Sequence, residues 1–541
     1  MKIYNNTLKC IAVLCGLLFS CGSSNSNGTI ISTPVENIDT RPLKYSVLTE
    51  NEKQNWNHLD LIQDTIPGMS VDKAYDEIVK NKKGKTTIVA VIDSGIDITH
   101  EDLDGVIWTN KAEVPNNGKD DDNNGYIDDI HGWNFLGDTY YEQMEYTRLL
   151  ASGDTSNPRY AEAQKEYNEA VQKYTTYKTQ YGQLITEIKA ADKAVATHLG
   201  KANYTKEDVS NIKTENESLA RSVSIIKYVY TLDFDNVQTA LVDLGAQLED
   251  LNNWLDYRLN KSFKGRKTGD NVNDITDTKY GNNNVMPMKE GEVHGTFVAG
   301  IIAAERKNNR GIKGVANNVL IMPLRVVSDA DEYDKDVALA IRYAVDNGAK
   351  IINGSFGKYY SPHPEWVQDA IKYAASKNVL FVHASGNESL DIDTKTNFPN
   401  DDLNATTEIS DNFLSIGALN SKYGSGLVAD YSNYGRKNVD IFAPGSQIYS
   451  TEPGNKYDYA DGTSFASPNA AGVAALVWSQ YPNLTASQVK SILINSGVDL
   501  TNKVSVGGDP NNVKSFNTIS KSGKIVNAYN ALIMAQQMSA Q

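Results

Sequence analysis

Three short motifs, far apart in the chain, carry the side chains that nucleophilic hydrolysis needs. Asp93 lies in Val-Ile-Asp-Ser-Gly, His294 begins His-Gly-Thr, and Ser464 lies in Gly-Thr-Ser-Phe-Ala. A serine hydroxyl is a weak nucleophile at neutral pH, but a histidine can take its proton while an aspartate holds the imidazole in the productive tautomer. If the fold brings them together, the three side chains could cleave an acyl bond through an acyl-enzyme.

Each motif stands beside a strand or helix that could position it. The apolar run at 88–92 is closed by Ser-Gly after Asp93, which predicts a buried strand over 85–92 that ends at Asp93. In an open parallel sheet, functional groups lie just past the carboxyl ends of the strands. Apolar runs rich in small residues follow His294 and Ser464 and predict two buried helices, and Pro468 falls in a first turn, where proline is tolerated.

The rest of this part of the chain alternates strands and helices. Short apolar runs at 319–327 and 379–383 predict strands, and helical spacing at 336–346 and 364–376 predicts helices. Such alternation indicates a three-layer α/β fold around a mainly parallel central sheet.

The motifs together resemble those of the subtilisin-like serine peptidases, the subtilases. Subtilisins use the order Asp, His, Ser, whereas chymotrypsin-type enzymes and α/β-hydrolases use other orders. The resemblance covers about 60–135 and 285–535. It includes three further motifs, Ile-Asn-Gly-Ser-Phe-Gly at 352–357, Ala-Ser-Gly-Asn at 384–387 and Asp-Ile-Phe-Ala-Pro-Gly at 440–445. It implies a subtilisin-like fold and a serine endopeptidase.

The resemblance also implies a role for each reacting group. Ser464 would attack a peptide carbonyl, His294 would act first as general base and then as general acid, and Asp93 would orient the imidazole. The side-chain amide of Asn387 and the backbone N–H of Ser464 would hold the oxyanion. From the residues alone, Asn387 could equally be a turn residue after Gly386.

The same resemblance implies a substrate-binding edge, on which an extended peptide pairs with backbone groups. The residues that would form this edge are Asn353, Ser355 and Gly357. Two alternatives to a peptidase stay open. One is a catalytically silent scaffold that binds partners through a helical arm, and the other is an esterase or amidase that uses the same three groups.

An acidic loop at 120–131 resembles part of an EF-hand. Counted from Asp120, oxygen-bearing side chains occupy positions 1, 3, 5 and 9, and a glycine occupies position 6. These side chains are Asp120, Asp122, Asn124 and Asp128. His131 stands at position 12 in place of glutamate, which excludes a complete EF-hand. We expect a structural calcium ion here and no catalytic metal, and the alternative is an acidic turn exposed to solvent.

Asp93 and His294 are separated by 201 positions, far more than such a domain needs. Within this interval, 141–263 predicts a helical insertion. Apolar residues and tyrosines from Tyr160 to Val195 keep the 3-4 spacing of a coiled-coil seam on one long helix. Two further helices starting near Thr205 and Asp235 could complete an antiparallel bundle. We expect either an inert decoration or an arm that gates substrate or docks a protein partner.

The start of the chain has the features of an export signal. A basic segment precedes the short apolar run 11–19, and Leu-Leu-Phe-Ser-Cys at 17–21 resembles a bacterial lipobox. Cys21 would then be the lipidated residue of a membrane-anchored, exported lipoprotein. An ordinary cleaved signal peptide or an uncleaved anchor is the alternative.

Composition limits the remaining possibilities. The formal charge of −15 argues against nucleic acid as a partner, and all three cysteines lie within the first 21 residues, so the body has neither a disulfide nor a thiol nucleophile. The expected division is a signal peptide at 1–20, a tether at 21–60, a first catalytic part at 61–140, the helical insertion at 141–263 and a second catalytic part at 264–541.

Overall fold

The computed structural model describes residues 47–232, 234–403 and 407–540. The predicted signal peptide and the predicted lipidation site Cys21 lie outside the described residues. Within those ranges, no helix combines the length and the apolar character needed to cross a bilayer.

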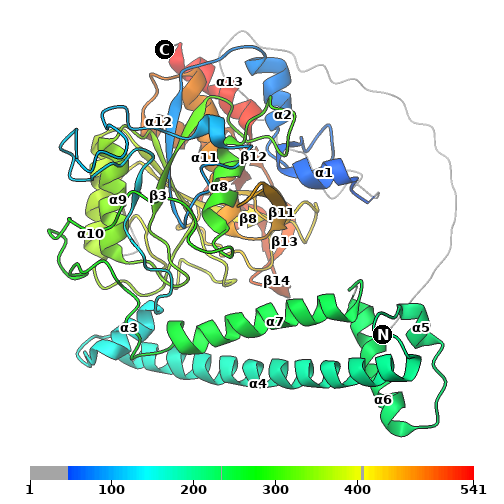
Figure 1. Ribbon diagram of the computed structural model, residues 1–541. Coiled ribbons are helices and arrows are strands. Elements are labelled where there is room, and N and C mark those ends of the chain that lie inside the picture. Colours follow the sequence, from blue (N-terminus) through cyan, green and yellow to red (C-terminus); the bar gives the residue numbers. More distant parts are fainter. Residues whose placement is uncertain (1–46, 233, 404–406, 541) are drawn as a thin grey trace, which may run out of the picture. The chain divides into compact units, whose positions relative to one another are not determined.

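Among the described residues, a nine-stranded sheet forms the centre of the part of the chain outside the insertion at 141–263, which we call the catalytic body after its predicted role (Figure 1). In chain order its strands are β1 (Thr87–Asp93), β2 (Trp133–Asn134), β3 (Val319–Arg325), β4 (Ile351–Gly354), β5 (Leu380–Ala384), β8 (Phe413–Leu419), β9 (Ile441–Pro444), β12 (Val498–Asp499) and β15 (Lys524–Ile525). Their spatial order is β12-β15-β9-β8-β5-β4-β1-β3-β2, and every neighbouring pair is parallel except β12 with β15. The prediction of a mainly parallel sheet is confirmed.

Helices cover both faces of this sheet, because alternate residues of the central strands point to opposite sides. Val89 and Val91 of β1 belong to one apolar core, together with α8 (His294–Ala303) and α11 (Thr463–Gln480). Ala90 and Ile92 belong to the other core, together with α9 (Asp334–Asp346) and α10 (Pro364–Ser376). The result is the predicted three-layer α/β fold, in which the helices that begin at His294 and beside Ser464 lie on the same face.

Smaller elements complete the catalytic body. They are α1 (Glu50–Asn55), η2 (Trp56–His58), α2 (Val71–Ala74), η3 (Tyr75–Val79), η4 (Asp104–Val106), α12 (Ala486–Ser496), η7 (Phe516–Thr518), α13 (Ala528–Ser539), and the hairpins β6–β7 (Asp402–Leu403, Thr407–Glu408), β10–β11 (Ile448–Glu452, Lys456–Ala460) and β13–β14 (Lys503–Val506, Asp509–Ser515). Trp56 anchors the segment before the sheet, since its side chain is buried and its Nε1 donates to Ser446 O at 3.0 Å.

The insertion between β2 and α8 is helical. Its elements are α3 (Glu145–Ser152), α4 (Tyr160–Leu199), α5 (Lys206–Ser210), α6 (Glu217–Val229), η5 (Tyr230–Leu232), α7 (Val237–Asn253) and η6 (Trp254–Arg258). The predicted long helix is α4, with 40 residues, and both α6 and α7 pack against it (Figure 1). Two apolar clusters hold the insertion together.

The two clusters differ in what they contain. The distal core consists only of insertion side chains and is centred on Ile188, Val195 and Ile226. The base core contains Tyr146 and Leu259 of the insertion together with Tyr360, which belongs to the catalytic body.

Candidate active site

Asp93 is the last residue of β1 and is fully buried. Its Oδ1 accepts from the Ser94 backbone N–H at 2.7 Å and from His294 Nδ1 at 2.7 Å. Its Oδ2 is buried without a hydrogen-bond partner among the described residues. Strand β1 thus ends where the sequence predicts, with its terminal carboxylate against the imidazole.

His294 is the first residue of α8, and the glycine after it allows that helix to approach the end of β1. A Cβ at Gly295 would lie 2.6 Å from the backbone oxygen of Ser94, closer than real atoms come. The Gly295 N–H instead donates to Ser94 Oγ at 3.0 Å. The bond to Asp93 occupies Nδ1 of the imidazole, which leaves Nε2 for proton transfer.

Two opposing effects set the pKa of His294. Burial alone lowers the pKa, whereas the negative charge of Asp93 and its hydrogen bond raise it. The net result is a His294 pKa above its ordinary value. The ring is 36% exposed and packs against Phe465 with centroids 5.5 Å apart, so that one side of it faces solvent.

Ser464 lies at the start of α11, next to the end of β4. Its Oγ donates to the Ser355 backbone oxygen at 3.1 Å, and Ser355 Oγ donates to the Ser464 backbone oxygen at 2.7 Å. The following residue, Phe465, contacts His294. Asp93 and His294 are thus hydrogen-bonded to each other, and Ser464 lies in the first turn of the helix whose next residue lies against the His294 ring.

The Asn387 side chain is fixed by the residue before Ser464. Its Oδ1 accepts from the Thr463 N–H at 2.8 Å and from Thr463 Oγ1 at 2.9 Å. With Oδ1 held in this way, the Nδ2 donors are available for a substrate oxygen. Asn387 and Ser464 line the same cavity, as an oxyanion site requires.

That cavity has a volume of ≈ 200 Å³. It is lined by Phe356, Gly357, Tyr359, Ala384, Gly386, Asn387, Glu388, Asn397, Thr463 and Ser464. Of the predicted edge residues, Gly357 lines the cavity and is exposed, and Ser355 touches Ser464. Asn353 is buried behind them, where Nδ2 donates to Ser355 Oγ at 2.9 Å and Oδ1 accepts from Ser467 Oγ at 2.8 Å.

A buried ion pair lies behind the Asp93–His294 bond, and the sequence analysis missed it. Arg325 ends β3 directly beside Asp93, and its Nε donates to Glu292 Oε1 at 2.6 Å. The same carboxylate accepts from the Gly95 N–H at 2.7 Å and the Met288 N–H at 2.8 Å. The pair therefore ties the loop after Asp93 to the segment that leads into His294.

Comparison with known protein families shows to which family the chain belongs. The model of the subtilase family matches 84–514, which is most of the chain and includes all three motifs. The chain belongs to the subtilase family.

This subtilase is similar to several curated proteases. It is 37% identical over 273 residues to the cell wall-associated protease of Bacillus subtilis (strain 168), covering 50% of this chain and 26% of that protein. It is 38% identical over 241 residues to the thermophilic serine proteinase of Bacillus sp. (strain AK1), covering 44% of this chain and 52% of that protein. Subtilisin DY of Bacillus licheniformis is 34% identical over 214 residues, covering 39% of this chain and 72% of that protein. The chain thus spans about half or less of the length of the first two relatives.

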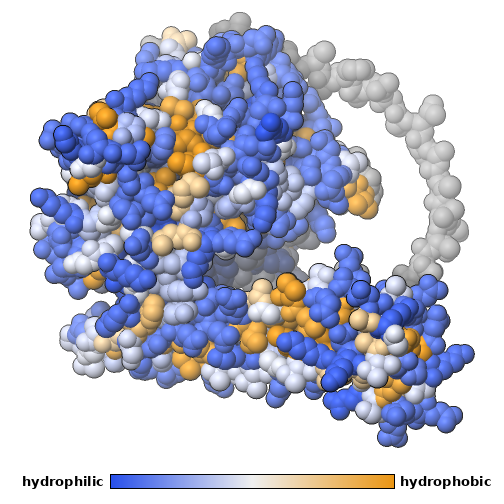
Figure 2. Space-filling model, in the orientation of Figure 1, coloured by the Kyte–Doolittle hydropathy of each residue, from blue (hydrophilic) through white to orange (hydrophobic). Residues whose placement is uncertain are grey.

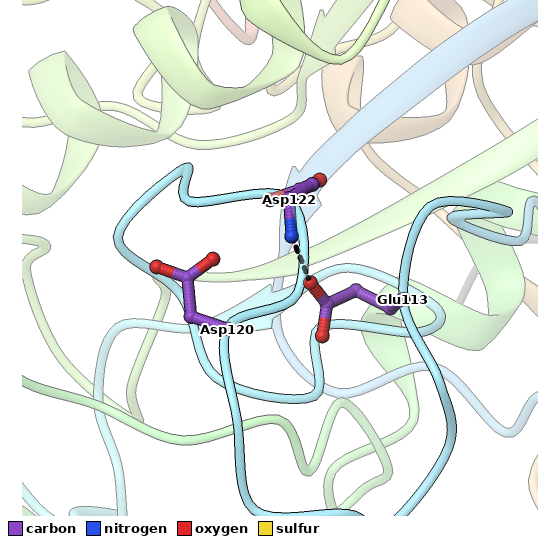
Figure 3. A group of neighbouring side chains, drawn as sticks. All are labelled: Glu113, Asp120 and Asp122. Carbon is purple, nitrogen blue, oxygen red and sulfur yellow. Dashed lines mark hydrogen bonds between the residues drawn. The ribbon is translucent and has the colours of Figure 1, made fainter.

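The acidic loop of this subtilase brings together Asp120, Asp122 and a third residue, Glu113 (Figure 3). One oxygen of each lies within 4.8 Å of the others. Glu113 Oε1 accepts from the backbone N–H groups of Asp121 at 2.8 Å and Asp122 at 3.1 Å. Glu113 is only 6% exposed, and its Oε2 is buried without a hydrogen-bond partner among the described residues. An unpaired carboxylate oxygen of this kind fits a hard cation.

The other two predicted ligands hold the loop in shape. Both oxygens of Asp128 accept backbone N–H groups, from Asn117 at 3.1 Å and Gly118 at 2.8 Å. Asn124 Oδ1 accepts from the Tyr126 N–H at 2.8 Å. The EF-hand pattern counted from Asp120 does not include Glu113, because Glu113 precedes Asp120 by seven residues (120 − 113).

Proposed function

We propose that this protein is a serine endopeptidase that cleaves peptide bonds through an acyl-enzyme on Ser464. The observation that carries the proposal is the 2.7 Å bond between His294 Nδ1 and the buried Asp93 carboxylate, next to the helix that bears Ser464. Membership of the subtilase family and similarity to proteases support it.

In the first step, the Ser464 hydroxyl turns from the Ser355 oxygen towards His294 Nε2. His294 takes the hydroxyl proton as Oγ attacks the peptide carbonyl, and Asp93 stabilises the imidazolium. The negative charge on the former carbonyl oxygen is held by Asn387 Nδ2 and the Ser464 N–H, and the N-terminus of α11 also favours it.

Collapse of the tetrahedral intermediate breaks the carbon–nitrogen bond. His294 gives its proton to the departing amine, and the acyl group stays on Ser464. A water molecule then attacks the ester with His294 again as base, which releases the acid product and restores the hydroxyl. The cavity beside Asn387 takes the side chain that precedes the scissile bond, and the 355–357 edge pairs with the extended substrate backbone.

A fluorophosphonate probe tests this proposal against its alternatives. Covalent labelling of the purified protein at Ser464, located by mass spectrometry, separates an enzyme from a silent scaffold. Cleavage of casein and of a peptide library separates an endopeptidase from an esterase or amidase. A protein that is labelled but hydrolyses only simple esters contradicts the proposal.

We also propose that Asp120, Asp122 and Glu113 hold a structural calcium ion, supported by the unpaired Glu113 oxygen. A ligand that binds only the folded state at about 100 times its Kd stabilises that state by about 2.7 kcal/mol. We therefore expect chelation to lower Tm by several degrees, and added calcium to restore it.

Two variants make the calcium experiment specific. In Glu113→Gln, calcium should raise Tm much less than in the wild type, and calorimetry should show weaker binding. Asp138→Asn, which removes an exposed carboxylate outside the loop, should respond to calcium as the wild type does. Identical calcium responses of Glu113→Gln and the wild type would contradict this site.

We further propose that the distal part of the insertion contacts large protein substrates. Hydrophobic residues gather on the insertion in Figure 2, and its exposed large apolar side chains are Tyr177, Tyr228, Leu232 and Val242. Apolar groups exposed on a surface favour contact with another protein.

Shortening the insertion tests this role. The rings of Tyr174 and Trp254 stack with centroids 4.1 Å apart, so a short glycine-serine linker can join these residues and replace 175–253. We expect casein cleavage to fall on the order of tenfold, the loss of a few contacts, while small peptides are cleaved at the wild-type rate. Equal effects on casein and peptides would contradict the role.

The lipid-anchored export suggested by the first 21 residues stays a prediction.

A further inference from the structure

The base of the insertion touches the wall of the substrate cavity. Tyr359, which lines this cavity, accepts a hydrogen bond at its backbone oxygen from Arg159 Nη1, immediately before α4. The two residues are 200 positions apart in the chain. The insertion therefore reaches the site through direct bonds to the segment that follows Gly357.

The Arg159 side chain is oriented before it meets Tyr359. Its Nε and Nη2 donate to the two carboxylate oxygens of Glu162 at 2.8 and 2.9 Å, a two-pronged pairing that fixes the guanidinium plane. The plane also lies over the Tyr360 ring, 4.0 Å from its centroid. Only Nη1 is left over, and it is the atom that donates to Tyr359.

Tyr360 is fixed by the insertion as well. Its hydroxyl donates to Glu166 Oε2 at 2.9 Å, and its buried ring meets that of Tyr146 edge-on at 6.0 Å. The insertion thus binds two consecutive residues of the catalytic body: Arg159, just before α4, holds the backbone of Tyr359, and α3 and α4 hold the side chain of Tyr360.

The other end of Tyr359 faces the oxyanion site. Its hydroxyl donates to Glu388 Oε2 and accepts from Asn433 Nδ2 at 2.9 Å. The same Glu388 oxygen accepts from the Asn387 N–H at 2.8 Å. Tyr359 is therefore bound at its carbonyl by the insertion and at its hydroxyl by the residue next to Asn387.

A buried ion pair joins the insertion to the same segment. Lys358 is 3% exposed, and its Nζ donates to Glu145 of α3 at 2.8 Å and lies 3.0 Å from Asp334 of α9. Arg148 of α3 donates to the same Glu145 carboxylate at 2.6 Å. Removing one member of such a group leaves a buried charge without its partner. The α3 helix is consequently built into this edge of the site.

We propose that the insertion completes the substrate cavity, with Arg159 as a positioning residue that holds Tyr359 in the cavity wall. The inference rests on the proposed peptidase function and goes beyond it, because it assigns part of the specificity to the insertion. Substrates with a large side chain before the scissile bond should depend on this wall most, because they fill more of the ≈ 200 Å³ cavity that Tyr359 lines.

The test uses the full-length protein with Arg159→Met, which keeps most of the side-chain stem and removes the donor. We expect KM for peptides with a large residue before the scissile bond to rise about tenfold, as for the loss of a hydrogen bond from a charged donor. Peptides with alanine there should show wild-type KM, and kcat should change little. Arg159→Lys, which retains a cation and a donor, should recover part of the loss.

Arg221→Met is the matched control, because Arg221 lies on α6 of the same insertion with its side chain 75% exposed. It should behave as wild type. An unchanged preference in Arg159→Met, or an equal loss for all peptides through kcat, would overturn the inference. If Arg159→Met does not fold, Glu162→Gln, which loosens the guanidinium, should alter the preference in the same direction, and an unchanged preference there also overturns it.

Fluorophosphonate labelling distinguishes a failure of the proposed peptidase function from a failure of the proposed role of Arg159. Equal labelling rates of the wild type and the Arg159 variants are expected, since the probe needs only the reacting groups. Absence of labelling in the wild type contradicts the peptidase, whereas normal labelling with an unaltered preference contradicts only the role of Arg159.

Discussion

Replacing Ser464 with alanine is expected to lower kcat for peptide hydrolysis by about 10⁶-fold, the loss caused by removing the nucleophile of such a triad. Ser464 is half-buried at the start of α11, and alanine fits there without strain, so the fold and Tm should stay close to those of the wild type. The measurement is kcat and KM for a fluorogenic peptide, together with fluorophosphonate labelling.

A serine elsewhere on the catalytic body provides the control. Ser425→Ala removes an exposed hydroxyl in the loop after β8 and should keep full activity and labelling. Some hydrolysis above that in water should remain in Ser464→Ala, because Asn387 still offers its donor to the oxyanion. Activity of Ser464→Ala within about tenfold of wild type would show that another group attacks the substrate.

Replacing Asp93 with asparagine should lower kcat at neutral pH by about 10⁴-fold, although the side chain keeps its shape. The amide favours the histidine tautomer that carries its proton on Nε2, and this tautomer cannot take the proton of Ser464. The amide also lacks the negative charge with which Asp93 raises the pKa of His294. The imidazole must be neutral to act as base, so the remaining activity should reach half of its maximum at a lower pH than in the wild type.

The pH profile distinguishes this effect from a loss of stability. Asp97→Asn removes another buried carboxylate close by, one that accepts from Thr99 Oγ1 at 2.7 Å and from the Gly454 N–H at 2.9 Å. It should lower Tm and leave the acid side of the pH–rate profile where it is. A wild-type profile in Asp93→Asn would mean that Asp93 does not act on His294.

The sequence predicts the elements around the reacting groups because their signals are local. The apolar run before Asp93 and the small-residue helices after His294 and Ser464 are found where they were predicted. Gly295 shows why such motifs are informative, since no other residue lets α8 come so close to β1.

What the sequence analysis missed depends on contacts between distant segments. Glu292 and Arg325 pair across 33 positions, and Arg159 meets Tyr359 across 200. No periodicity links such residues, because tertiary packing alone brings them together. Glu113 was missed for a related reason: its carboxylate comes from the segment before the acidic loop and joins it only through folding.

Because the insertion has a distal core and a separate base core, its distal part can unfold locally without its base. Among the described residues, Ile188 and Ile226 belong to a core made of insertion side chains, whereas Tyr146 packs with Tyr360 of the body. Local opening costs less free energy than global unfolding. The helices of the distal core can therefore unfold and refold while the base core stays packed. Cleavage of the insertion by another protease near the distal core should therefore leave the cleavage-site preference of the protein unchanged. The helices of the distal core could likewise be replaced by other sequences without a change in the reaction at Ser464.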